Sequence, residues 1–402
     1  MRIKMRLKIA IVGCGAFARN FVELFQAHPY VEEVYVCDCI RERAQEYAGL
    51  FHAPVIDSYE EVLKNKEINA VALFTQRHLH GPMAIQALQN GKHVYCAVPM
   101  ASHPEECHEI TELVKKTGLT YMMGETCYYY PCAMFARQVY TQGKLGDFVY
   151  GAAQYYHHID SISYGKRPAE RGMPPLLYPT HSTAMILSAV DSYVTEVSCF
   201  GYEEKKDACF GKGRNEWDNP FSCEFVMMKL ANGGTARVTE GRNFGWMKPS
   251  SYISGLYGTK GGYEFSIGQH VLVEKDFAAS EEKVVLTDVS DYVNPIPAVE
   301  HKNSPDLRND LANGKWQWSS QAKIQEKEVL RLPESYRGLR NGHMGTHKFL
   351  IDDFCTAAYQ GSRPSVDAWM AARYTIPGLT AHQSAMQGGA VRKVFDCGDG
   401  GR

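Results

Sequence analysis

The apolar residues in the first third of the chain follow two alternating patterns. Short runs of β-branched and other apolar residues predict buried strands, whereas segments in which apolar residues recur every three or four positions predict helices. The strands are expected at residues 8–12, 33–37, 70–74, 93–97 and 119–123. The helices are expected at residues 16–27, 41–50, 59–64, 81–90 and 104–117. Strands and helices that alternate in this way predict a parallel, doubly wound α/β sheet.

The pattern changes beyond about residue 130. A helix over 132–142 is followed by longer stretches in which apolar and polar residues alternate, as in antiparallel strands with one open face. These strands are expected at residues 148–157, 194–202, 222–230, 234–240, 252–257 and 262–266. Two more helices are expected at 346–360 and 367–387, while 267–340 is irregular and predicts loops. We therefore expect two domains: a doubly wound domain over residues 1–130, and an α+β domain with an open, mostly antiparallel sheet over residues 131–402.

The first strand ends in a G-x-G-x-x-A turn. Gly13 permits the tight turn, and Gly15 lets the backbone approach a pyrophosphate. Ala16 and Phe17 follow at the expected start of the next helix, where free N–H groups face the phosphates. The second strand ends in Asp38, whose carboxylate can accept hydrogen bonds from ribose hydroxyls and repels a 2′-phosphate. The pattern predicts a Rossmann domain that binds NAD in preference to NADP.

Charge and cysteine content narrow the class of protein further. The 402 residues include 43 Lys and Arg against 45 Asp and Glu, so nothing indicates a nucleic-acid or anionic-membrane partner. No apolar stretch approaches the ~20 residues that cross a bilayer, and the basic N-terminus runs directly into the first strand, unlike a signal peptide. The twelve cysteines form no C-x-x-C pair. We therefore expect a cytoplasmic protein with reduced, mostly buried thiols.

Two further segments carry a family resemblance. Thr75-Gln76-Arg77-His78-Leu79-His80 follows the third strand, and Ala97-Val98-Pro99 follows the fourth. The first is similar to a T-P-x-x-x-H segment, and the second stands where Glu-Lys-Pro is usual, in the Gfo/Idh/MocA family of NAD(P)-dependent sugar oxidoreductases. The resemblance implies a Rossmann domain, an open-sheet domain and a carbohydrate substrate. It also implies that a nucleotide cofactor contacts Thr75, Gln76, His78, His80 and Val98.

The valine at position 98 departs from the usual family pattern. The usual lysine assists removal of the proton from the hydroxyl that is oxidised, and a valine side chain cannot do so. One branch of the family also lacks this lysine and carries E-V-P there. It comprises the NAD-dependent α-N-acetylgalactosaminidases and related glycosidases.

Two other segments resemble the same branch. Residues 122–129 are similar to its M-M-x-E-N-x-x-Y segment, which places a functional tyrosine at Tyr129, with Tyr128 beside it. Tyr178-Pro179-Thr180-His181 looks like its Y-P-T-H segment, where the tyrosine and histidine line the sugar site. The resemblance implies His181, Tyr178 and Tyr129 as catalytic residues. Tyr128 and the polar residues His157 and His158 at the end of a strand are candidate substrate contacts.

The glycosidase branch implies a redox step inside a hydrolysis. The sugar is oxidised, commonly at C3, and the ketone acidifies the neighbouring C2–H. Loss of that proton eliminates the C1 substituent, water adds, and the ketone is reduced again. We expect His181 to serve the hydroxyl at the hydride centre and Tyr129 or Tyr178 to take the C2 proton. Thr180 or Ser182 is expected to cap a helix over 183–190, with His181 near its positive end.

Other interpretations remain open from the sequence. A conventional NAD-dependent sugar or inositol dehydrogenase could use His181 in place of the missing lysine. A non-catalytic NAD-binding sensor would bind the nucleotide and need no proton-transfer group. His343 and His347, followed by Asp352-Asp353, have the spacing of a metal site, but a glycine breaks the helix between them and we expect no metal. A helix start that faces the substrate and an ordinary structural role are the other interpretations of this segment. An exposed sheet face favours a homo-oligomer.

Overall fold

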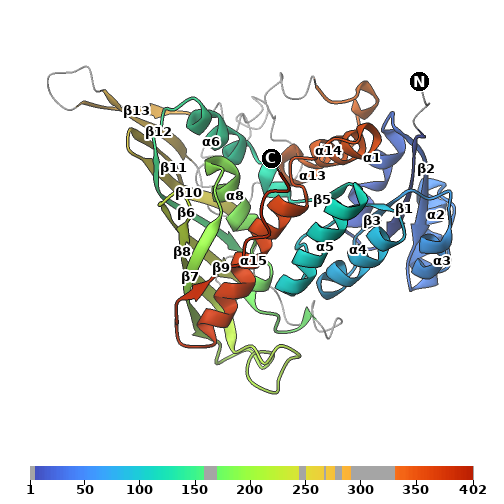
Figure 1. The fold of residues 1–402 in the computed structure, drawn as a ribbon, viewed down its shortest axis with the longest axis horizontal. Helices are drawn as coiled ribbons and strands as arrows, with labels where there is room; N and C mark the ends of the chain where they lie inside the picture. The colour runs from blue at the N-terminus through green and yellow to red at the C-terminus, as the bar shows by residue number, and fades with distance from the viewer. Residues whose placement is uncertain are drawn as a thin grey trace, which may run out of the picture. The chain divides into compact units, whose positions relative to one another are not determined.

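The computed structural model describes residues 5–157, 170–243, 250–266, 269–276, 283–290 and 331–401. The chain divides into two compact units. The first comprises Met1–Thr126, Lys327–Arg373 and Cys397–Arg402, and the second comprises Cys127–Glu326 and Tyr374–Asp396. Figure 1 labels most of the helices and strands, numbered in chain order.

The first unit is built on a parallel five-stranded sheet in the order β2-β1-β3-β4-β5 (Figure 1). Its strands are β1 (Leu7–Val12), β2 (Val31–Cys37), β3 (Ala70–Leu73), β4 (His93–Cys96) and β5 (Tyr121–Met123). All of β3 is buried, as expected of a central strand with both faces covered. The strand order reverses between β1 and β3, which places the carboxyl ends of those two strands at the switch point where cofactors bind. The predicted doubly wound fold is confirmed.

The helices of this unit follow the predicted order with one break. They are α1 (Val22–Ala27), α2 (Arg41–Phe51), α3 (Tyr59–Lys64), α4 (His80–Gln89), α5 (Pro104–Thr117), α13 (Gly342–Gly345) and α14 (His347–Gln360). The single helix expected over 16–27 is wrong. A 3-10 turn, Ala18–Asn20, precedes a short α1, and Phe21 joins them with φ −114°. The tight turn lets the chain leave the glycine segment before regular α-helix begins.

A segment from late in the chain completes the first unit. The ring of Phe354 in α14 packs against Phe25 and Tyr95 at centroid distances of 6.4 and 5.7 Å. The expected domains were two continuous ranges, 1–130 and 131–402. The observed units differ because this apolar helix buries its face among side chains of the N-terminal sheet and helices.

The second unit contains a nine-stranded sheet in the order β13-β12-β11-β10-β6-β9-β8-β7-β14 (Figure 1). Its strands are β6 (Phe148–Tyr156), β7 (Val194–Glu203), β8 (Phe221–Leu230), β9 (Thr235–Gly241), β10 (Ser250–Gly258), β11 (Gly261–Ser266), β12 (Gln269–Asp276), β13 (Lys283–Asp288) and β14 (Arg392–Lys393). Only β6 and β9 pair in parallel within this sheet. The predicted open, mostly antiparallel sheet is confirmed.

Loops are predicted throughout 267–340, but this range contains two strands, β12 and β13, so the prediction is wrong there. β12 and β13 pair with one another, and β12 also pairs with β11. Every residue of β13 is exposed, including the apolar run Val284-Val285-Leu286. A strand without a buried face has no reason to alternate apolar and polar residues, so the sequence pattern could not reveal it.

Helices cover one face of the nine-stranded sheet (Figure 1). They are α6 (Pro131–Thr141), α8 (Thr180–Val190) and the second half of α15 (Ala368–Ala385). Phe200, Phe225 and Met227 are 63%, 41% and 45% exposed, and Phe200 pairs directly with Phe225 across β7 and β8. An apolar group of this kind is the feature on which the expectation of a homo-oligomer rests. The oligomeric state stays a prediction.

The structure bears on two expectations from the sequence, one about membrane-spanning helices and one about the cysteine thiols. Within the described ranges, no helix combines the length and the apolar character that crossing a membrane requires. All twelve cysteines are free thiols, and ten of them are buried. The expectation that most thiols are buried is therefore confirmed, while their reduced state and a cytoplasmic location stay predictions.

His93 in β4 makes the stability of the first unit depend on pH. Its Nδ1 accepts the N–H of Thr120 at 2.9 Å, and burial lowers the pKa of His93 to about 4. The unfolded histidine, with a pKa of about 6.5, binds a proton that the folded one does not, so stability falls as the pH drops from about 6.5 to 4. His93→Asn keeps an acceptor at the Nδ1 position and should flatten this slope by up to roughly 1.4 kcal/mol per pH unit.

Urea unfolding at several pH values measures this slope. His270 and His347 are also buried with lowered pKa values, so the slope should be reduced and not abolished. His108→Asn, at an exposed position of α5, is the matched control and should leave the slope unchanged. Equal slopes for the wild-type protein and His93→Asn would contradict the assignment.

Candidate active site

The glycine turn of the first unit leaves room for a phosphate. Gly13 has φ +95°, and a Cβ there would lie 2.7 Å from the carbonyl oxygen of Phe74, so only glycine fits. A Cβ at Gly15 would meet no atom of the described residues within 4 Å. The backbone at Gly15 therefore borders open space, as a close approach of a pyrophosphate requires.

Asp38 anchors this turn from the end of β2. Its Oδ2 accepts the N–H of Cys14 at 2.7 Å, and its Oδ1 accepts the N–H of Ile40 at 2.8 Å. Each carboxylate oxygen has a second lone pair, so both can still accept a hydrogen bond from a ribose hydroxyl. Asp38 thus fits the predicted role at the ribose and also fixes the glycine turn.

The side chain of Phe17 is directed into an aromatic cluster. Its ring lies 5.0 Å from Phe21, 5.9 Å from Phe74 and 5.5 Å from His343 between centroids, each in an edge-to-face arrangement. The ring is therefore occupied with packing. If Phe17 contacts a cofactor as predicted, we expect its backbone to do so, as for the exposed Ala16.

The loop after β3 offers unused polar atoms. Thr75 Oγ1 and His78 Nδ1 are buried without a hydrogen-bond partner in the described part of the chain. Buried polar atoms are normally paired, so these two fit a ligand that bonds them. Together with Asp38 and the space at Gly15, they fit a dinucleotide at the carboxyl ends of β1, β2 and β3. Gln76 stands between them, half-buried.

The imidazole of His80 contacts the backbone of this loop. Its Nδ1 lies 2.8 Å from the carbonyl oxygen of Pro99, and its Nε2 lies 3.2 Å from that of Thr75. The ring is 1% exposed. We therefore assign His80 to joining the loop after β3 to the segment that carries Val98. Val98 itself is 7% exposed and aliphatic, so this position supplies no group for proton transfer.

His343 and His347 contact one another in the first unit. His343 Nδ1 lies 2.8 Å from His347 Nε2, and the His347 ring packs on Phe21. Burial, and then the neighbouring His343, hold the pKa of His347 well below its usual value. The acids that follow have other partners: Asp352 bonds His28, and Asp353 accepts the N–H of Ser365. The four residues considered as a metal site do not converge.

The second unit brings His181 and Tyr178 together. α8 begins at Thr180, which places His181 in its first turn, and the Tyr178 hydroxyl lies 2.8 Å from His181 Nε2. On the other side of the imidazole, Cys127 Sγ lies 3.5 Å from Nδ1. A phenol bonded to an imidazole can pass its proton to the ring, so the pair can work as a general acid and base.

The expected side-chain cap of α8 is wrong. Pro179 occupies the N-cap position, and no side chain caps the helix. Ser182 instead donates its hydroxyl to the carbonyl of Pro179 at 2.9 Å and to the carboxylate of Glu240. The buried carboxylate is a charged acceptor and attracts the serine hydroxyl more strongly than a helix N–H donor would.

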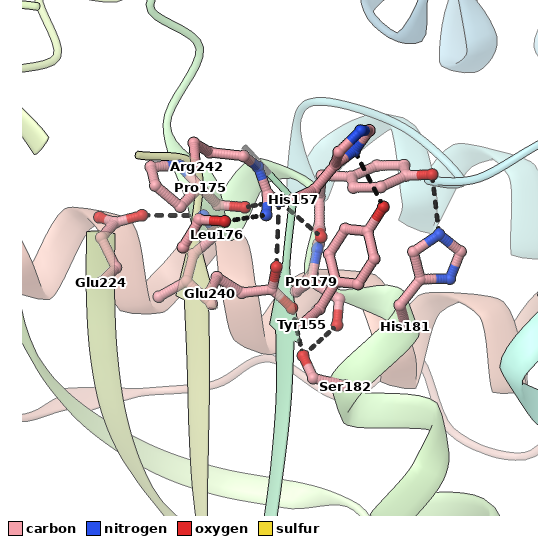
Figure 2. Close-up of polar contacts among 12 residues, drawn as sticks. Tyr155, His157, Pro175, Leu176, Pro179, His181, Ser182, Glu224, Glu240 and Arg242 are labelled. Carbon is pink, nitrogen blue, oxygen red and sulfur yellow. Dashed lines mark hydrogen bonds and ion pairs between the residues drawn. The ribbon is translucent and has the colours of Figure 1, made fainter. Parts of the chain in front are cut away.

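Tyr155 belongs to the same group. The sequence places it in the polar run that ends a strand near the site, but it gives this tyrosine no role of its own. Its ring packs edge-to-face on His181 at 4.7 Å between centroids, and its hydroxyl lies 3.1 Å from His157 Nδ1 (Figure 2). Strand alternation could have found it: β6 directs Gly151 toward Ile186 of α8, and Tyr155 lies on the same face four residues later. The candidate substrate contact His157 is thus linked to the pair through Tyr155. His158 lies outside the described residues.

Tyr128 and Tyr129 lie on a short 3-10 turn, Thr126–Tyr129. Tyr129 is 4% exposed, and its ring meets that of Tyr128 edge-to-face at 4.9 Å. The guanidinium of Arg137 lies 4.0 Å over the Tyr128 ring. A cation over the ring face is a favourable packing contact, so one face of the Tyr128 ring is already occupied by Arg137.

Comparison with known proteins identifies the first unit. Residues 7–125 match the model of an oxidoreductase family with an NAD-binding Rossmann fold. These residues belong to the Gfo/Idh/MocA oxidoreductase family. The predicted family and the NAD cofactor are confirmed. Membership of the Gfo/Idh/MocA family agrees with the glycine turn, Asp38 and the unpartnered polar atoms after β3.

Two curated relatives and one solved structure extend the comparison. A glycosyl hydrolase family 109 protein of Streptomyces filamentosus is 27% identical over 64% of this chain and 58% of its own length. A second, of Streptomyces niveus, is 22% identical over 97% of this chain and 77% of its own length. A levoglucosan dehydrogenase, solved with NADH and levoglucosan, is 17% identical with a TM-score of 0.71, covering 97% of this chain and 99% of the other. This chain spans 58% of the length of the first relative.

Proposed function

We propose that this Gfo/Idh/MocA protein acts on a carbohydrate, and that its hydride transfer is the internal redox step of glycosidic-bond cleavage. The Tyr178–His181 pair in the second unit carries the proposal. Position 98 is aliphatic, so the proton-transfer groups must come from elsewhere, and a hydrogen-bonded phenol and imidazole are suited to that work. The names of the two Streptomyces relatives, both glycosyl hydrolases, support cleavage.

The proposed chemistry assigns the pair to two proton transfers. NAD, when bound, accepts a hydride from a sugar carbon and returns it at the end. We propose that Tyr178 contacts the sugar and that His181 Nε2 takes the proton that the phenol collects from the hydroxyl at that carbon. The resulting ketone acidifies the adjacent C–H. The phenolate form of a site tyrosine, Tyr178 or Tyr129, takes that proton, and the C1–O bond breaks as the protonated His181 gives its proton to the leaving oxygen. Water then adds at C1, with its proton returning to His181.

Incubation in D₂O with NAD tests this function. Aryl glycosides and free sugars are supplied in turn, while released aglycone and the absorbance of reduced cofactor are both followed. We expect aglycone release without net NADH, and deuterium at C2 of the product. Stoichiometric NADH with a free sugar would instead indicate a conventional dehydrogenase. NAD binding with neither signal would indicate a sensor, and either result would overturn the proposal.

A further inference from the structure

Glu240 and Arg242 form a buried ion pair at the end of β9. Their side chains are 0% and 3% exposed, and Arg242 Nη2 lies 3.0 Å from Glu240 Oε2 (Figure 2). Removing two charges from water costs about as much as their attraction returns, so a buried pair is weak evidence of a stabilising role. The contacts of this pair indicate another reason for it.

Arg242 reaches the segment that carries Tyr178. Its Nη2 donates to the carbonyl oxygen of Pro175 at 2.9 Å and to that of Tyr178 at 3.4 Å. The guanidinium also lies over the rings of Tyr155 and Tyr178, at 5.2 and 5.6 Å from their centroids. Arg242 therefore contacts both the backbone and the ring of Tyr178. A planar guanidinium can donate in several directions while it stacks on a ring, which a lysine ammonium cannot do.

Glu240 reaches the segment that carries His181. Its Oε1 accepts the hydroxyl of Ser182, the next residue along the first turn of α8 (Figure 2). Ser182 also bonds the carbonyl of Pro179, between the tyrosine and the histidine. The ion pair thus joins the two segments whose side chains meet at 2.8 Å in the Tyr178–His181 pair.

We propose that Arg242 and Glu240 are positioning residues that hold the Tyr178 hydroxyl at hydrogen-bond distance from His181 Nε2. Neither needs to touch the substrate. A misplacement of about 1 Å between reacting groups can cost about 100-fold in rate, so a rigid, buried support for both segments has a direct catalytic consequence. The activity part of this inference rests on the proposed function, whereas the geometric part does not.

Glu224 provides a matched control in the same unit. It is a second fully buried carboxylate, and it accepts the N–H of Leu176 at 2.8 Å, two residues before Tyr178. Its other oxygen lies 2.7 Å from His382 Nδ1. Glu224 therefore supports the same turn, but none of these bonds joins it to Tyr178, His181 or Ser182. Glu224→Gln therefore neutralises a buried carboxylate beside the same turn and leaves the bonds of Glu240 to Ser182 and Arg242 in place.

The kinetic test compares Arg242→Lys and Glu240→Gln with Glu224→Gln in the NAD-loaded protein. We expect kcat to fall about 30- to 100-fold for the first two, with KM and the Kd for NAD changed by less than about 3-fold. Glu224→Gln should keep kcat within about 3-fold of wild type, even if its melting temperature falls as far as those of the other two variants. Equal losses of kcat in all three variants would overturn the proposal, because they would indicate general damage to the fold.

A second measurement needs no substrate. The ring nitrogens of His181 are observed by ¹⁵N NMR and assigned by their loss in His181→Asn. Arg242→Lys should move the Nε2 signal, which reports the bond to Tyr178, and Glu224→Gln should not. An unmoved signal in Arg242→Lys would overturn the positioning role. If the wild-type protein turns over no glycoside or sugar, the proposed function fails while this measurement still decides the inference.

Discussion

Tyr178→Phe is expected to lower kcat by about 10³-fold while leaving NAD binding unchanged. The substitution keeps the ring and removes only the hydroxyl that lies 2.8 Å from His181 Nε2. A positioned acid or base contributes about 10²- to 10⁴-fold to a rate, so its removal should cost an amount in this range. His181→Ala should cost about as much. Because the two groups pass one proton between them, the double variant should be little worse than either single one.

Steady-state kinetics with aryl glycosides, together with calorimetric titration of NAD, check this result. Tyr202→Phe is the matched control, since that tyrosine is 55% exposed on a strand of the same sheet. Its kcat should equal that of the wild type. Losses that multiply in the double variant would show that Tyr178 and His181 act separately. A fully active Tyr178→Phe would remove the phenol from the mechanism.

Asp38→Ala is expected to weaken NAD binding by about 100-fold or more. The change removes the acceptor for the ribose hydroxyls and also the carboxylate that holds the N–H groups of Cys14 and Ile40. Hydrogen bonds to a charged group contribute about 1.5–3 kcal/mol each, and each 1.4 kcal/mol is tenfold in affinity. The loss of negative charge should also narrow the preference for NAD over NADP, because a 2′-phosphate is no longer repelled.

Calorimetric titration of both nucleotides measures the two effects, with circular dichroism to confirm that the variant is folded. Asp57→Ala, at an exposed carboxylate, should bind NAD as the wild type does. A wild-type Kd for NAD in folded Asp38→Ala would exclude the role assigned to Asp38. An unchanged ratio of NAD to NADP affinity would show that its charge does not select the cofactor.

The fold could be predicted wherever one physical requirement governs a segment. Buried parallel strands must be apolar, so β1 to β5 were recognisable within a few residues of their ends. The turn at Gly13 accepts no side chain, because a Cβ would meet the backbone of Phe74. β13 obeys no such requirement, since all its residues are exposed, and it could not be found in the same way.

The candidate site could be predicted only in part. Sequence resemblance indicated Tyr178 and His181, and the structure places their side chains in hydrogen-bond contact. The sequence placed Tyr155 at the end of a strand near the site without a role of its own. Its position beside His181 depends on the pairing of β6 within the sheet and on α8 packing over that face. Ser182 was expected to cap a helix, but its hydroxyl instead donates to the carboxylate of Glu240, 58 residues away in the chain.

By itself, the sequence determined the order of strands and helices, the glycine turn with its ribose-binding acid, and the absence of a lysine at position 98. These are local properties, set by side-chain volume, backbone freedom and the period of apolar residues. Only the tertiary structure decided that Arg242 and Glu240 join the segments of Tyr178 and His181, and that α14 returns to the N-terminal sheet. Such contacts depend on distances between segments far apart in the chain, which no local pattern records.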